Sequence, residues 1–230
     1  MREGYSLRMD ETPLPMHARR RELGEASRQH ILDVAVRLMS ERGFEGTAMS
    51  ALCKETGLPA SSIYWHFGSK DGLLEAVMER GGEQFFTSFP DPGDAAEPAD
   101  KLRRFVRSTG AWLLEESRNG QFLQLQLRFR LSRRAPLAEK FAAKADAGMQ
   151  KSIEYVRAWI AYAYASEGEE VAQRLAAETA HFAVAMLDGV FIMVYDDDRV
   201  DAVEMIDDAA EALVSRVESR LAAIKPAATE

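Results

Sequence analysis

Residues 59–70 bring small hydroxyl side chains together with a phenol and an ammonium group in one short segment. Ser61 and Ser62 are small enough for a helix that carries them to enter the major groove of DNA, where a hydroxyl can hydrogen-bond to base edges. Tyr64 has a rigid ring that can place its hydroxyl beside a phosphate oxygen, and Lys70 supplies a positive charge at the start of a further helix. This pattern predicts contact with both the bases and the backbone of DNA.

The sequence around this segment contains the helices needed to present it. Apolar residues recur at helical spacing from Ser27, a residue suited to an N-cap, to Gly43, which we expect to end the first helix. A short helix is expected over residues 47–56, with its first threonine as the cap. After a turn at Gly57, Pro59 begins another short helix, as proline does in a first helical turn. Two short helices joined by a glycine turn predict a helix-turn-helix.

A run of about 50 residues carries a resemblance to a known family. From Arg28 to Val77 it is RQHILDVAVRLMSERGFEGTAMSALCKETGLPASSIYWHFGSKDGLLEAV. Its Gly43-Phe44 pair, its Thr47 and its Gly57 fall at that family's spacings, as does the aromatic block that precedes the next helix. The run resembles the DNA-binding domain of TetR-family transcriptional regulators. The resemblance implies an all-α protein, with an N-terminal three-helix helix-turn-helix domain and a C-terminal helical bundle for ligand binding and dimerisation.

The resemblance also implies roles for individual side chains. The positions that match backbone contacts are Thr47, Tyr64, His66 and Lys70. The base-reading surface consists of Pro59, Ala60, Ser61, Ser62 and Trp65, and we add Arg28, at the start of the match, to the DNA-binding set. Two of these residues have alternatives, because Trp65 could anchor the small core and His66 could be a buried connector to the next helix.

Two positions depart from the family pattern. Pro59 stands where a serine able to cap the recognition helix is common, so one possible hydrogen bond to DNA is missing, although the fixed φ of proline still suits a helix start. Cys53 stands where alanine is usual and is small enough to fill the same core position. A redox role for Cys53 would need an exposed, electropositive setting that the sequence does not establish.

Charge is distributed unevenly along the 230-residue chain, whose net charge is −8. Residues 17–80 contain 9 Lys and Arg against 9 Asp and Glu, whereas residues 81–230 contain 18 against 25. Acidic residues disfavour binding to phosphate. Because most of the excess lies outside the DNA-binding segment, the net charge does not contradict a nucleic-acid partner.

Features that the sequence lacks disfavour several classes of protein. The single cysteine cannot form an intramolecular disulfide. No stretch approaches 18 uninterrupted apolar residues, and the N-terminus lacks the layout of a signal peptide. There is no glycine-rich phosphate loop, no nucleophile elbow and no pair of histidines at helical spacing. We therefore expect a cytoplasmic protein that is not an enzyme, with no cofactor, no metal site and no membrane partner.

Composition and periodicity divide the chain into three parts. Residues 1–25 mix proline, glycine and charge, so we expect a flexible arm that ends in three consecutive arginines from Arg19. Those arginines could reach DNA or could belong to a solvated tail. Residues 26–80 are expected to form the DNA-binding domain and residues 81–230 the helical domain for effector binding and dimerisation.

The junction between these domains contains residues that disfavour helix. Ser69 is expected to cap a helix that continues to about Glu83, where Gly81 and Gly82 weaken it. Residues 86–100 are rich in proline and indicate a connection between domains.

The last two helical segments predict the dimer interface. Residues 170–195 are apolar nearly all round, which predicts burial on more than one side. In residues 203–224 the apolar positions step by threes and fours, as in a helix-packing seam. Together they favour an isologous dimer, with an intrachain core as the alternative. The interface residues predicted on this basis are Ala183, Gly189, Val190, Ile206, Ala210, Leu213 and Val217.

Aromatic and methionine side chains in the second domain predict a ligand site, because the resemblance places their helices around a cavity. The predicted lining is Phe105, Trp112, Phe122, Gln126, Phe129, Met149, Tyr155, Trp159, Phe182 and Met186. Taken alone, each of these residue types belongs more often to a core than to the lining of a pocket. The expected function is a repressor that a small, mainly apolar effector releases from a pseudo-palindromic double-stranded DNA operator. The alternative is a DNA-binding regulator with no small-molecule effector, controlled by a protein partner or by abundance.

Overall fold

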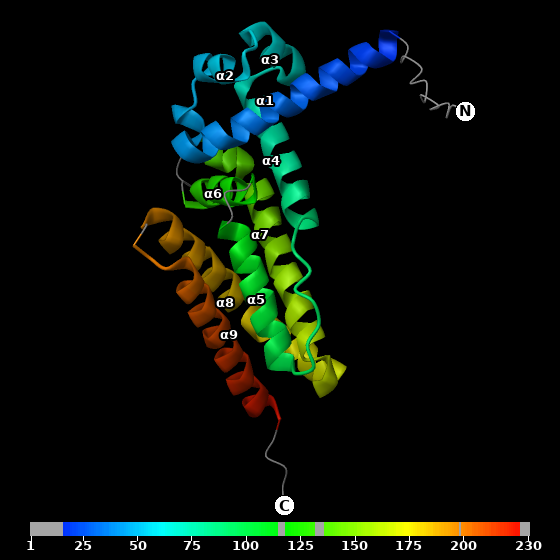
Figure 1. The fold of residues 1–230 in the computed structure, drawn as a ribbon, viewed down its shortest axis with the longest axis vertical. Helices are drawn as coiled ribbons and strands as arrows, with labels where there is room; N and C mark the ends of the chain where they lie inside the picture. The colour runs from blue at the N-terminus through cyan, green and yellow to red at the C-terminus, as the bar shows by residue number, and fades with distance from the viewer. Residues whose placement is uncertain (1–15, 115–117, 132–135, 198, 226–230) are drawn as a thin grey trace, which may run out of the picture.

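The computed structural model describes residues 16–114, 118–131, 136–197 and 199–225, and all the regular secondary structure in these ranges is helical. Four helices lie at one end of the molecule, and an elongated bundle extends from them (Figure 1). The first group is α1 (Met16–Gly46), α2 (Met49–Thr56), α3 (Ala60–Phe67) and α4 (Lys70–Thr87). The rest are α5 (Pro98–Leu114), α6 (Arg118–Leu131), α7 (Pro136–Ala163), the short 3-10 helix η1 (Ala165–Glu167), α8 (Glu169–Asp196) and α9 (Ala202–Ile224). The all-α fold class is as expected.

Helix α1 is longer than the sequence predicted. It begins at Met16, so residues 16–25 are helical and the expected flexible arm is wrong for them. The remainder of that arm, residues 1–15, lies outside the described residues. Ser27 is not an N-cap, because its hydroxyl donates to the carbonyl of Leu23, one turn earlier in the same helix, at 2.9 Å.

Helix α4 joins the two ends of the molecule as one continuous element. It runs to Thr87, past the two glycines that were expected to weaken it. At Gly81 a Cβ would lie 2.3 Å from the ring of Phe122, so the glycine allows α4 and α6 to pack closely. The expected domain boundary after residue 80 therefore falls inside a helix, and the connection from α4 to α5 is shorter than predicted.

Helix α6 lies between the DNA-binding end and the bundle (Figure 1). It packs against α1 and α4 and also against α7. Its Arg128 guanidinium donates to the carbonyl of Glu41 on α1 at 3.2 Å, and its Arg130 pairs with Asp188 on α8 at 3.1 Å. This helix was not predicted from the sequence as a separate element, although, like α4, it contacts both ends of the molecule.

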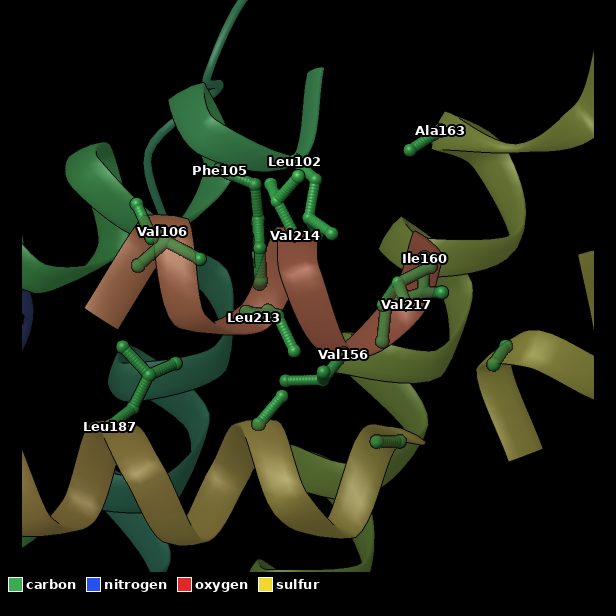
Figure 2. Close-up of a cluster of buried hydrophobic side chains, with 14 of the residues drawn as sticks. Leu102, Phe105, Val106, Val156, Ile160, Ala163, Leu187, Leu213, Val214 and Val217 are labelled. Atoms are coloured by element: carbon green, nitrogen blue, oxygen red, sulfur yellow. The ribbon is translucent and has the colours of Figure 1, made fainter. Parts of the chain in front are cut away.

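Buried side chains form two hydrophobic clusters, one for each end of the molecule. The first contains Leu52 and Ile63 and continues through α4 into α6. The second lies among α5, α7, α8 and α9. Figure 2 shows that Leu213 of α9 lies between the other helices of the bundle, near Val156 and Leu187. Helix α9 is therefore part of the core of a single chain.

Helix α8 is apolar around most of its circumference, and other helices cover it on more than one side. Among the described residues it is a helix long and apolar enough to match a membrane span by composition alone. However, α7 and α9 both pack extensively against it. These neighbours bury part of the apolar surface of α8, as the sequence predicted, whereas Phe182, Ile192 and Met193 remain exposed.

Candidate DNA interface and effector cavity

Helices α2 and α3 form a helix-turn-helix that a few buried side chains hold in place. Leu52 of α2 and Ile63 of α3 are 0% and 1% exposed. Gly57 ends α2 with a φ of 68°, a left-handed conformation that favours glycine. Pro59 precedes α3 in an extended conformation, and its carbonyl accepts a hydrogen bond from the N–H of Ser62 at 3.0 Å. Proline thus starts α3 without a side-chain cap.

The outer face of α3 carries the side chains that were assigned to DNA. Ser61 and Tyr64 are exposed, and Ala60 and Ser62 are partly exposed. Trp65 is 78% exposed, so the alternative that it anchors the core is wrong. An exposed tryptophan at this position is a large apolar surface available to a partner.

His66 was predicted either to contact the DNA backbone or to be a buried connector to the next helix, and its exposure is intermediate between the two. Its side chain is half-buried, and its ring meets the Trp65 ring edge-on, with centroids 4.6 Å apart. The Phe67 ring lies on its other side at 5.9 Å. His66 therefore contacts both neighbouring rings and is neither fully buried nor fully exposed.

Thr47 is the member of the DNA-binding set that the structure places in the interior. It is 0% exposed, and its hydroxyl makes hydrogen bonds with the carbonyl oxygens of Leu38 and Gly43 at 3.1 and 2.8 Å. Gly43 has a φ of 74°, outside the helical range, and interrupts α1 at the position where the sequence predicted a stop; a short helical segment then continues to Gly46. The residue that precedes α2 is Ala48, which makes no side-chain cap. Thr47 therefore stabilises the turn between α1 and α2, and both its predicted cap and its predicted phosphate contact are wrong.

Lys70 stands at the start of α4, beside the end of α1. Ser69 caps α4 as predicted, because its hydroxyl accepts from the N–H of Gly72 at 2.9 Å. The Nζ of Lys70 lies 4.2 Å from the centroid of the Phe44 ring, over its face. This position keeps the ammonium group at the surface near α3, where a phosphate can approach it.

Helix α1 is fastened to its neighbours close to where it leaves the domain. The Arg80 guanidinium on α4 donates to the side chains of Asp33 and Gln29, each at 2.7 Å. One residue further toward the N-terminus, the Arg28 guanidinium lies over the Phe67 ring, 5.6 Å from its centroid. These contacts fix the direction in which the N-terminal part of α1 extends.

The bundle encloses a small cavity lined by residues of α4 to α8 and of the connection after α4. Its volume is about 40 Å³, which is room for roughly three water molecules. Phe105 and Tyr155 line it and were predicted to do so. The other lining residues are Phe85, Phe89, Thr109, Leu113, Leu123, Ser152, Val156, Val184, Leu187 and Asp188. Phe85 and Phe89 were missed because α4 was expected to end before them.

The remaining residues of the predicted ligand set do not line this cavity. Phe182 is 42% exposed on the outside of α8. Trp112 and Phe122 pack against Phe85, with ring centroids 4.9 and 5.6 Å apart. Trp159 stacks on Phe105 from the far side, at 5.5 Å. The others, which pack in the bundle or against its two clusters, are Gln126, Phe129, Met149 and Met186.

Four polar side chains line the cavity, those of Thr109, Ser152, Tyr155 and Asp188, and two of them stand out. The Thr109 hydroxyl is buried and has no hydrogen-bond partner among the described residues. Asp188 is paired with Arg130, but burial raises the pKa of its carboxyl group, and the guanidinium offsets only part of that effect. The cavity is thus an apolar, aromatic space with one unpaired hydroxyl and one carboxyl group at its wall.

Comparisons with known proteins bear on both ends of the chain. Residues 31–77 match the model of the bacterial regulatory proteins, tetR family. The HTH-type transcriptional regulator AcrR of Shigella flexneri is 38% identical over 64 residues, which are 28% of this chain and 30% of AcrR. The DNA-binding end of this chain is therefore similar to that of TetR-family regulators. The matched segment spans about a third of the length of the curated relatives. The similarity in sequence therefore concerns the DNA-binding end alone.

Solved structures extend the TetR-family likeness to the whole fold. AibR in complex with isovaleryl coenzyme A and operator DNA has a TM-score of 0.58 at 19% identity, covering 82% of this chain and 98% of AibR. A proposed transcriptional regulator from Saccharomonospora viridis, in complex with choline, has a TM-score of 0.61 at 20% identity, covering 83% and 96%. At these identities the likeness concerns the arrangement of the helices.

The predicted dimer seam faces inward. Ala210, Leu213 and Val217 are 0% exposed within a single chain, as is Ala183. Val190 and Ile206 are also buried, whereas Gly189 is partly exposed. A side chain already surrounded by its own chain has no surface left for a partner, so the predicted interface is wrong for these buried residues and the intrachain alternative holds for them.

The opposite face of the last two helices carries exposed apolar side chains. Ile192 and Met193 of α8 are 42% and 50% exposed, and Val203 at the start of α9 is 70% exposed. Phe182 belongs to the same helix as the first two, and the Arg216 guanidinium of α9 lies 5.9 Å from its ring centroid. Helices α8 and α9 lie side by side along one edge of the molecule (Figure 1).

Proposed function

We propose that this chain is a sequence-specific DNA-binding transcription regulator that acts in the cytoplasm and is not an enzyme. The observation that carries the proposal is the outer face of α3, where small serines and an exposed Tyr64 and Trp65 lie on a helix-turn-helix that matches the TetR-family model. In the complex α3 enters the major groove, with Ser61, Ser62 and Trp65 at the base edges. Tyr64 and Lys70 hold phosphates on either side.

The active form in this proposal is a homodimer on a pseudo-palindromic operator. One helix-turn-helix reads one half-site, so a twofold axis between two chains would place the recognition helices in successive turns of the duplex. The exposed apolar side chains of α8 and α9 support this arrangement, because large apolar groups exposed on neighbouring helices suit an interaction site. The proposed interface is centred on Phe182, Ile192 and Met193, with Val203 at its edge.

We also propose that the regulator is a repressor released by a small, mainly apolar effector that binds in the cavity. Two proteins of similar fold are described with small molecules, isovaleryl coenzyme A and choline. In this chain aromatic rings line the space, and the Thr109 hydroxyl lacks a partner among the described residues. Because the volume is only about 40 Å³, an effector must separate the helices to enter. That movement can reach α1 through α6, whose Arg130 and Arg128 contact Asp188 and α1.

The small cavity also favours a second candidate, a regulator without a small-molecule effector. A space for roughly three waters holds no molecule of metabolite size as it stands. In that case abundance or a protein partner sets the occupancy of the operator.

The test begins with selection of bound duplexes from a random DNA pool. The proposal expects paired half-sites related by a twofold axis and a dimer by light scattering; single unpaired half-sites bound by monomer would contradict it. Each small molecule in a ligand panel is then titrated into free protein and into the protein–operator complex. An effector that releases DNA must bind the complex more weakly, by about 5- to 150-fold for a coupling of about 1–3 kcal/mol. If no compound distinguishes the two states, the regulator without an effector is favoured.

A further inference from the structure

A groove of about 820 Å³ separates the N-terminal part of α1 from the recognition helix. Five residues of α1 and two of α3 line it, so it joins segments about 40 residues apart in the sequence. The α1 side carries Arg20, Arg21 and Arg28, and the α3 side carries Trp65 and His66. The groove therefore opens beside the same tryptophan that marks the outer face of α3.

The charge of this groove is strongly positive. Three guanidinium groups line it against one carboxylate, that of Glu25. Glu25 is engaged within α1, where its Oε1 accepts from Gln29 at 2.7 Å and lies 3.9 Å from Arg28. Arg20 and Arg21 are exposed, and neither has an ion pair with a carboxylate in the part of the chain that the structure describes. Guanidinium groups of this kind suit phosphate oxygens, which they can bind with two parallel hydrogen bonds.

The position of the groove relative to the rest of the molecule is fixed by the fastening of α1. Arg80 holds α1 at Gln29 and Asp33, and the helix then continues outward to Met16. The part from Met16 to Arg28 is about 18 Å long at the helical rise. In Figure 1 it projects beyond the other helices, on the side away from α8 and α9. If α8 and α9 face the twofold axis, this part lies on the outer side of each half-site.

We propose that this groove holds the phosphate backbone of duplex DNA that flanks the operator, outside the base pairs that α3 reads. The inference rests on the proposed function, because it needs α3 in the major groove. At 3.4 Å per base pair, an extension of about 18 Å runs along about five flanking base pairs. Arg20 and Arg21 contact backbone there without reading sequence. They also supply local positive charge to a chain whose net charge of −8 otherwise repels DNA.

The experiment compares two duplexes that share one operator recovered by selection. One duplex ends at the outer edges of the half-sites, and the other continues for ten base pairs of arbitrary sequence on each side. Binding is measured by fluorescence anisotropy between 50 and 200 mM salt. The proteins are the full chain, the Arg20→Ala/Arg21→Ala variant, and the Arg20→Lys/Arg21→Lys variant, which keeps the charge. Arg157→Ala/Arg174→Ala is the matched control, since it removes two exposed arginines from the bundle.

The expected result is a difference in salt dependence that appears only with the flanks. On the long duplex the alanine variant neutralises four fewer phosphates per dimer, so the slope of log affinity against log salt becomes shallower by about 3.6. Between 50 and 200 mM salt the affinity of the variant therefore falls by a factor about 150 smaller than that of the full chain. On the short duplex the full chain and the variant have equal slopes. The lysine variant and the bundle control behave as the full chain on both duplexes.

Two results would overturn the inference, and they are distinguishable. If the full chain has the same slope on both duplexes, the groove holds no flanking backbone, while sequence-specific binding and the proposed function remain intact. If selection recovers no preferred DNA at all, the proposed function fails together with the inference.

Discussion

The α1–α4 end and the α5–α9 bundle build their functional surfaces in different ways. At the DNA-binding end, the face offered to a partner belongs mainly to one short helix, and Ser61, Tyr64 and Trp65 lie within five consecutive residues. In the bundle, the cavity is lined by residues from α4 to α8, and the exposed apolar face spans two helices. A surface on one helix depends on local spacing, whereas a surface shared among helices depends on how each helix is rotated.

The two ends also differ in how far their ion pairs are exposed to solvent. At the DNA-binding end Arg37 pairs with Glu55 at the surface, at 2.8 Å, and this lowers the pKa of Glu55. In the bundle the Arg130–Asp188 pair lies at the wall of a cavity, and burial raises the pKa of Asp188. The first pair fastens α2 to α1 in solvent, while the second holds a desolvated group that a ligand or a helix movement can disturb.

The largest effect is expected at the inward face of α9. Leu213→Ala removes a side chain that is 0% exposed, so it should lower the free energy of unfolding by about 2–5 kcal/mol. Urea denaturation at a fixed protomer concentration measures this, because the stability of a dimer depends on concentration. Ser215→Ala, an exposed change on the same helix, should stay within about 0.5 kcal/mol. If the Leu213→Ala protein were fully stable but monomeric, the dimer interface would instead involve the face of α9 that carries Leu213.

A smaller effect, on assembly alone, is expected at the outward face of α8. Met193→Glu should leave the chain folded, because this side chain is 50% exposed, but it places a carboxylate on both sides of the proposed twofold interface. A cost of about 3 kcal/mol would raise the dimer dissociation constant about 100-fold. Analytical ultracentrifugation over a concentration series measures the shift, and Ala158→Glu on the exposed side of α7 is the control. Unchanged dimerisation would place the interface on another face.

Predictions from the sequence were most accurate for residues that act only on the backbone next to them. Gly57 at the turn and Ser69 at the cap of α4 were both predicted correctly, because each acts within three residues of its own position. Thr47 was misplaced because a threonine before a helix can either cap it or turn inward, and the kink at Gly43 decides between the two. That kink depends on packing, which spacing alone does not reveal.

The bundle was less predictable for the same physical reason. Steps of three and four in α9 show that one face is apolar, but an intrachain core and a dimer interface require the same pattern. Helix α6 was missed because polar and apolar residues alternate from Gln124 to Leu131, which obscures a helical period. The cavity was only partly predicted, because whether an aromatic ring lines it or packs behind it depends on helix rotation.

A finer test at the DNA-binding end concerns the interior position of Thr47. Thr47→Val keeps the shape of the side chain and removes its hydrogen bonds to Leu38 and Gly43, so the free energy of unfolding should fall by about 1 kcal/mol. The salt dependence of operator binding should not change. Lys70→Ala should do the reverse, with unchanged stability and a slope shallower by about 0.9 for each phosphate that is no longer neutralised. If Thr47→Val changed the affinity for DNA but not the free energy of unfolding, Thr47 would contact a phosphate as first predicted.

The smallest effect is a difference in pH dependence between the two ion pairs. Because the folded pKa of Asp188 is raised, its protonated form is favoured on folding. Its contribution to the free energy of unfolding is therefore fully present below the unfolded pKa, near 4, and is lost as the pH rises through the folded value. Glu55 has a lowered folded pKa, so its contribution is present above its unfolded pKa and is lost as the pH falls.

Comparing each protein with its amide variant isolates these two contributions. The stability of the full chain relative to Asp188→Asn should be greatest near pH 4 and decline toward pH 7, whereas relative to Glu55→Gln it should increase over the same range. Urea denaturation at several pH values gives both differences. In an Arg130→Gln background the decline at Asp188 should extend to higher pH, because the guanidinium that lowers this pKa is gone. If the stability difference between the full chain and Asp188→Asn increased with pH instead, the ion pair with Arg130 would outweigh burial at the cavity wall. The folded pKa of Asp188 would then be lowered, as that of Glu55 is.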